Sequence, residues 1–143
     1  EATIAELVSL AILMPIVASM GGNAGTQSLT VAVRALATKD LTGANVWRVI
    51  RRELLVGMLN GLCFAAVLGV VGMLWFSSPM LGAVIGTALV FNMIIAGFAG
   101  TVVPVTLDKM GIDPALASGT FVTTTTDVMG FFIFLGLASN VLL

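Results

Sequence analysis

A single aspartate, Asp127, lies within a long apolar segment near the end of the chain. It is the only charged residue from Pro114 to Leu143. If that segment is one helix, Asp127 lies roughly 20 Å from its start at ~1.5 Å per residue, which is the middle of a membrane. An ionised carboxylate at that depth costs about 2.5–3.5 kcal/mol, so such groups usually face water, an ion or a partner. We therefore expect Asp127 to be functional.

Threonines precede this aspartate on the expected helix. Thr123 and Asp127 are four residues apart, as are Thr120 and Thr124, so each pair shares a helix face. A threonine hydroxyl can bond the carbonyl one turn earlier within its own helix. It can also offer its oxygen to an ion. The run from Thr123 to Thr126 is open to both interpretations, bonding within the helix or an ion-lining face beside Asp127.

Three uses of the Asp127 carboxyl group compete. It can stay protonated and hydrogen-bond to a neighbouring helix, or it can titrate as the coupling group of a proton- or sodium-coupled transporter. It can also stay ionised and bind a divalent cation. One carboxylate per chain is few for such an ion, but a two-fold dimer brings two copies to one axis. Because Mg²⁺ usually keeps several waters, two carboxylates could hold it largely hydrated.

Residue types exclude other chemistry. The chain has no histidine and a single cysteine, Cys63, which leaves too few nitrogen and sulfur ligands for a zinc or copper site. An intramembrane aspartyl protease needs two carboxylates in contact, and only Asp127 lies deep within a span. We therefore expect that the chain is not an enzyme.

A second polar run interrupts the first apolar segment. It contains Gly21, Gly22, Asn23, Gly25 and Gln27. Small residues let helices pack closely, which is one interpretation. The number of polar groups favours the other, in which freed carbonyls and polar side chains line a pathway, and we expect the helix to kink or unwind here. The predicted pore lining comprises these five residues together with Gly119, Thr120, Thr123 and Thr124.

Composition places the chain in a membrane. It is 59% hydrophobic and 9% charged, with a mean hydropathy of +1.15. Soluble domains carry about 25% charged residues, so this chain could not cover a soluble surface. Backbone groups must bond to one another in lipid, and the apolar runs are long and do not alternate, which indicates helices rather than a barrel. The predicted fold is all-α, a polytopic transmembrane helical bundle.

Four membrane spans can be drawn in one ion-permeation domain that covers residues 1–143. The charge-free run from 54 to 107 is too long for one helix of ~20 residues, and Ser77-Ser78-Pro79 supplies a turn within it. The expected spans are about 4–33, 54–76, 80–103 and 115–143.

Prolines and asparagines within the spans have structural interpretations. Pro15 predicts a kink, Pro104 predicts the end of the third helix, and Pro114 is well placed to start the fourth. Asn60 and Asn92 are expected to form hydrogen bonds between helices.

Basic residues set the expected orientation. Five of the six lie in the loop at 34–53, and Lys109 lies between the third and fourth spans. The positive-inside rule makes both loops cytoplasmic and the turn at 77–79 external. Residues 45–54 place three arginines on one helical face, which is typical of an anchor on the inner membrane surface or of a docking surface for a cytoplasmic domain. Both termini are then outside, which predicts at least one further span before residue 1.

Together these segments resemble the MgtE family of magnesium channels and transporters. The resemblance rests on Pro-Ile-Val-Ala-Ser-Met-Gly-Gly-Asn-Ala-Gly-Thr-Gln at 15–27, Arg-Ala-Leu-Ala at 34–37, Asp-Pro-Ala-Leu-Ala-Ser-Gly at 113–119 and Thr-Thr-Thr-Thr-Asp-Val at 123–128. It extends over essentially the whole chain. The glycine-rich run and the threonine-rich run are specific when they occur together at this separation.

The resemblance implies a homodimer with five membrane helices per subunit, of which this chain would hold the last four. It implies that cytoplasmic regulatory CBS domains precede them and sense intracellular Mg²⁺. Asp127 matches the Mg²⁺ ligand of the pore, which the first and last spans of this chain would line. Some members carry Asn-Pro or Gly-Pro where this chain has Gly119-Thr120, so Gly119 offers only backbone there.

The expected cargo is Mg²⁺, with Co²⁺ or Mn²⁺ as further divalent candidates. The expected partners are a second copy of the chain, the lipid bilayer, the preceding regulatory domains and one further helix, with no nucleic acid. The expected location is the inner (plasma) membrane of the cell, which the chain crosses several times.

Overall fold

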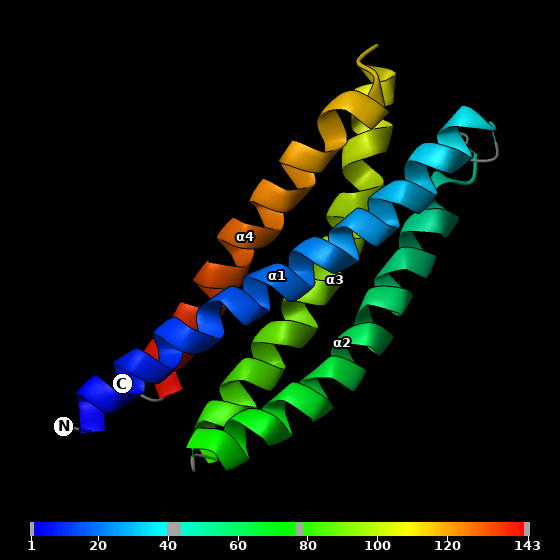
Figure 1. Ribbon diagram of the computed structural model, residues 1–143. Helices are drawn as coiled ribbons and strands as arrows, with labels where there is room; N and C mark the ends of the chain where they lie inside the picture. Colours follow the sequence, from blue (N-terminus) through cyan, green and yellow to red (C-terminus); the bar gives the residue numbers. More distant parts are fainter. Residues whose placement is uncertain (1, 40–43, 77–78, 142–143) are drawn as a thin grey trace.

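The computed structural model describes residues 2–39, 44–76 and 79–141 of the chain. Within these ranges the chain forms four helices and no strand (Figure 1). They are α1 (Ala2–Ala37), α2 (Val46–Phe76), α3 (Pro79–Lys109) and α4 (Pro114–Val141). The prediction of an all-α helical bundle is confirmed.

Helix α3 lies at the centre of the bundle. It packs against each of the other three helices, α1 also packs along α4, and α1 and α2 scarcely touch. Both chain termini, the end of α2 and the start of α3 lie at one end of the bundle (Figure 1). The other end carries Arg34 in the last turn of α1 and Lys109 in the last turn of α3. This distribution of charge fits the predicted orientation, in which the second end is cytoplasmic.

Glycines let α2 and α3 approach closely. A Cβ atom at Gly57 would lie 2.6 Å from the carbonyl oxygen of Met93, and one at Gly61 would lie 2.9 Å from the Cα atom of Val90. Helices in membranes associate through such close packing of small residues, because surrounding lipid is as apolar as their side chains. The result is an α2–α3 pair whose backbones are nearly in contact.

Small residues also pack α1 against α3 and α4. A Cβ atom at Gly25 would lie 2.6 Å from Cγ1 of Val122 on α4. A Cβ atom at Gly100 of α3 would lie 2.6 Å from Cβ of Ser28 on α1. Helix α1 is therefore held against both neighbours by positions that accept no side chain.

The apolar core lies toward the end that carries the termini. Its best-buried members, each 1% exposed or less, come from α1, α3 and α4 and are Val17, Ile85, Ala88, Leu89, Phe134 and Ala138. The outer surface of α2 is also apolar but uncovered, with Leu59 60%, Leu74 71% and Trp75 80% exposed. Such a surface suits contact with lipid.

Three of the described helical segments are long and apolar enough to cross a membrane. They are Val46–Trp75, Pro79–Lys109 and Ser118–Asn140. Helix α1, with 36 residues, is longer than these but is not among them. The fourth span, expected at about 4–33, remains a prediction.

The structure corrects two local predictions. We expected α1 to kink or unwind at its glycines, and unwinding is excluded because the helix is continuous from Ala2 to Ala37, with its glycines in contact with neighbouring helices. Pro104 does not end α3 but lies buried within it, and the helix continues to Lys109. Membrane helices tolerate an internal proline because neighbouring groups satisfy the freed backbone.

The predicted start of the last helix was correct. Pro114 is the first residue of α4, and Oδ1 of Asp113 accepts a hydrogen bond from the backbone N–H of Ala115 at 3.0 Å. This pairing satisfies one of the free donors at the helix start.

Residues 46–53, predicted as part of a loop, form the first turns of α2. Ser77 and Ser78 of the predicted turn lie outside the described residues.

Candidate functional site

Asp127 lies halfway along α4 and is half-buried. Among the residues that the structure describes, no hydrogen bond or ion pair engages its carboxylate. Thr120, Thr123 and Thr124 are exposed, and within the same residues their hydroxyls have no partner. We call these four residues the α4 face. It presents a carboxylate and three hydroxyls whose bonding capacity is unused among the described residues.

The other two threonines of the run bond within α4. Oγ1 of Thr125 donates to the carbonyl oxygen of Phe121 at 2.8 Å, and Oγ1 of Thr126 donates to that of Thr123 at 3.0 Å. Thr126 is fully buried and packs against Gly25 of α1. The two interpretations of the threonine run therefore apply to different members, with internal bonding at 125–126 and a free polar face at Thr123 and Thr124.

The predicted pore-lining residues of α1 also divide. Gly21 and Gly25 are buried, and neighbouring side chains fill the space that a Cβ atom would need. Gly22 is half-buried, with room for a Cβ atom 3.9 Å from Oγ1 of Thr126. Asn23 and Gln27 are exposed and line a cavity between α1 and α2. Within this chain Gly21 and Gly25 serve packing, and their place in a pore lining stays a prediction.

Gly119, at the other end of the predicted α4 lining, borders a separate cavity. This cavity, of about 390 Å³, lies between α1 and α4 and is lined in part by Thr30, Arg34 and Gly119. A Cβ atom at Gly119 would meet nothing within 4 Å, so packing in this chain does not require glycine there.

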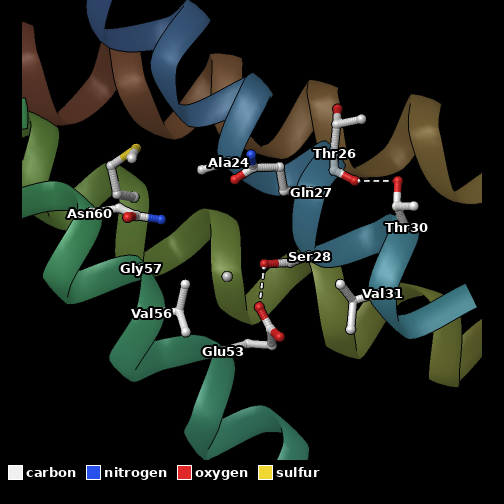
Figure 2. A pocket seen from close by; sticks show the side chains of 12 residues that line it. Ala24, Thr26, Gln27, Ser28, Thr30, Val31, Glu53, Val56, Gly57 and Asn60 are labelled. Carbon is white, nitrogen blue, oxygen red and sulfur yellow. Dashed lines mark hydrogen bonds between the residues drawn. The ribbon is translucent and has the colours of Figure 1, made fainter. Parts of the chain in front are cut away.

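A groove that sequence analysis did not predict runs between α1 and α2 with α3 as its floor (Figure 2). Two overlapping cavities of about 450 and 470 Å³ lie along it. Its polar lining includes Gln27, Ser28, Glu53 and Asn60, and we call it the α1–α2 groove.

Glu53 is the ionisable group of this groove. It is only 6% exposed, and its Oε2 accepts a hydrogen bond from Oγ of Ser28 at 2.8 Å (Figure 2). Its Oε1 lies 3.9 Å from Nη2 of Arg52, whose side chain is 63% exposed. In the sequence Glu53 follows Arg51 and Arg52 at the end of the predicted basic loop, so sequence analysis did not identify it as a buried group. The nearby glycines Gly57 and Gly61, one turn apart, were the signal that this helix end is packed.

Carboxylates are too few for a metal site enclosed by one chain. Within the described ranges, no three residues among His, Cys, Asp and Glu are placed to hold a metal ion together. Asp127 with neighbouring hydroxyls suits a hard cation that keeps most of its water, because such ions prefer oxygen ligands and Mg²⁺ loses water reluctantly.

These features define a class, a helical membrane protein with a half-buried carboxylate halfway along an apolar helix. A family model, MgtE, described as a divalent cation transporter, matches residues 14–137. The chain therefore belongs to the MgtE family, which is a family of transporters rather than enzymes.

Curated relatives carry the same family name. The chain is 40% identical over 139 residues to the magnesium transporter MgtE of Enterococcus faecalis and 34% identical over 139 residues to that of Bacillus subtilis. It is 38% identical over 138 residues to that of Thermus thermophilus. These matches cover 96–97% of this chain but only 30–31% of each relative. The chain thus spans about a third of the length of these relatives.

Proposed function

We propose that this chain forms the ion-permeation part of a magnesium transporter and that Asp127 is its cation ligand. The observation that carries the proposal is a half-buried carboxylate, halfway along an apolar helix, that no described protein group neutralises. A carboxylate in such a place needs compensation, and a dication supplies it. The magnesium transporters among the relatives make Mg²⁺ the favoured cargo, with Co²⁺ or Mn²⁺ as further candidates.

We further propose that a second copy completes the site across a two-fold axis. The α4 face is uncovered in one chain, and it offers one carboxylate and three hydroxyls. Two copies of Asp127 near one axis would repel each other, and a hydrated Mg²⁺ between them would offset that repulsion. A homodimer is the simplest symmetric assembly that provides this pair.

Permeation through such a pore is passive in this proposal. The membrane potential supplies about 4.6 kcal/mol per dication per 100 mV, which drives Mg²⁺ inward without a chemical energy source. Helix α1 serves as a fourth span in the plasma membrane, and a further helix and cytoplasmic regulatory domains precede it. The comparisons give no support to the proton- or sodium-coupled alternative.

The test is Mg²⁺ uptake into proteoliposomes by the protein that contains this chain, with Asp127→Ala and Asp127→Asn as variants. Both are expected to abolish uptake while the dimer still forms, as measured by light scattering on the purified protein. Uptake by the unchanged protein should persist at fixed voltage without a proton or sodium gradient. Normal uptake by both variants would refute the proposal.

A further inference from the structure

Asn92 lies in the middle of α3, where this helix meets both α1 and α4. Its side chain is fully buried, and Nδ2 donates a hydrogen bond to the carbonyl oxygen of Val17 on α1 at 3.0 Å. This bond confirms the prediction that Asn92 links two helices. Its Oδ1 is buried and has no partner among the described residues. The amide is thus only half satisfied in an apolar interior.

The amide group lies between two glycines. A Cβ atom at Gly21 of α1 would collide with Nδ2 of Asn92. A Cβ atom at Gly130 of α4 would lie 2.8 Å from the same nitrogen and 3.4 Å from the Cα atom of Ala18. While Asn92 is present, neither glycine can be replaced without a shift. The amide therefore fixes how closely α1 and α4 approach α3 at this level.

This contact lies next to the proposed cation ligand. Gly130 follows Asp127 by three residues, which is less than one turn of α4. On α1, Gly21 begins the run that includes Gly22, which packs toward Thr126. Asn92 therefore contacts α4 within one helical turn of Asp127. That contact constrains where the backbone of Asp127 lies relative to α1.

Stability alone does not explain an amide at this position. Removing one partner of a buried hydrogen bond is costly when the other partner is left unsatisfied, but the carbonyl of Val17 lies within the continuous helix α1 and keeps its backbone bond there. At the other end of the amide, Oδ1 has no partner among the described residues. Buried polar groups between membrane helices can instead fix one arrangement of the helices. A directed bond to Val17, combined with the two glycine contacts, selects one register of α1 against α3.

We propose that Asn92 is a positioning residue for the cation site, which sets the separation and register of α1 and α4 on which the geometry of Asp127 depends. The inference rests on the proposed function of Asp127. Asn92 itself is fully buried, so it acts through the two helices it separates and not by touching the ion.

The first test is Asn92→Leu in the protein that contains this chain, with Asn60→Leu as the matched control. Asn60 is an amide on α2 that borders the α1–α2 groove and contacts neither Gly21 nor Gly130. For Asn92→Leu we expect a melting temperature close to that of the unchanged protein. We expect the Mg²⁺ concentration at half-maximal uptake to rise about tenfold or more, as for reactive groups misplaced by about 1 Å. Asn60→Leu should leave both quantities unchanged.

The second test remains informative if Asn92→Leu folds poorly. Gly130→Ala should weaken uptake when Asn92 is present, because the new methyl group meets the amide. In an Asn92→Ala background the same change should cost nothing further, because the obstructing group is gone. Equal effects of Gly130→Ala in both backgrounds would overturn the inference.

Two further outcomes separate this inference from the function on which it rests. If Asp127→Asn abolishes uptake while Asn92→Leu gives a normal half-saturating Mg²⁺ concentration, the positioning role fails and the cation ligand stands. The positioning role also fails if uptake by Asn92→Leu falls only in proportion to the amount of folded protein. If Asp127→Asn transports normally, the proposed function itself fails.

Discussion

Glu53 of α2 and Asp127 of α4 are both carboxylates within long helices, and the structure treats them differently. Glu53 is almost fully buried in the α1–α2 groove and accepts a hydrogen bond from Ser28. Asp127 is half-buried on the α4 face, and no described protein group bonds to it. The first carboxylate is satisfied by its own chain, whereas the second depends on something outside it.

The difference shows that burial alone does not identify a functional carboxylate. A buried acid with a donor at 2.8 Å links two helices that otherwise scarcely touch. A less buried acid without a donor retains its charge for an ion or a partner. In this chain, bonding inside the protein therefore separates the structural acid from the proposed ligand more clearly than depth does.

The strongest way to break the comparison is to neutralise each carboxylate. Asp127→Asn should lower the rate of Mg²⁺ uptake about a hundredfold or more, because each carboxylate near a dication contributes several kcal/mol at short range. Glu53→Gln keeps an oxygen that can accept from Ser28, so its uptake should stay within about threefold of normal. Uptake of ²⁸Mg²⁺ into proteoliposomes measures both variants. Equal losses would show that the two carboxylates have the same role.

The packing difference between the two proposed pore helices can be tested at their glycines. Gly25→Val should destabilise the fold by about 1–3 kcal/mol, because its side chain would overlap that of Val122. Gly119→Val is the matched control, and it should change stability little because the space beside Gly119 is open. Unfolding in mixed micelles with increasing denaturing detergent would measure both. A larger loss at Gly119 would contradict the packing described for α1 and α4.

The structural role assigned to Glu53 predicts a difference between two of its own variants. Glu53→Ala leaves Oγ of Ser28 buried without its acceptor, which should cost about 1–2 kcal/mol of stability. Glu53→Gln should recover most of that loss. The same unfolding assay applies to both. If the two variants are equally stable, the Ser28 hydrogen bond contributes nothing measurable.

The smallest expected effect separates two neighbouring threonines. Thr123→Val removes a hydroxyl from the α4 face and should raise the half-saturating Mg²⁺ concentration about threefold, or roughly 0.7 kcal/mol. Thr125→Val removes a hydroxyl that already bonds to Phe121 and should leave that concentration unchanged. A titration of uptake against external Mg²⁺ resolves the two. An effect at Thr125 alone would reverse the assignment of the two threonines.

Several features followed from the residues in order along the chain. Long apolar runs require helices in lipid, which gave the four helices and, through Pro114, the start of the last one. A lone charge in such a run marks Asp127 without any knowledge of its neighbours. These predictions succeed because backbone bonding and the cost of burying charge depend mainly on local sequence.

The helix neighbours decided the rest. The sequence could not show that Gly21 and Gly25 face inward. A glycine in a pore lining and a glycine in a helix contact give the same sequence pattern. The sequence also could not divide Thr123 from Thr126, or reveal that Ser28 and Glu53, 25 residues apart, share a hydrogen bond. These features depend on the face each helix turns toward α3, which is set by contacts between distant residues. Local hydropathy determined what each segment is, and packing around α3 determined what each side chain meets.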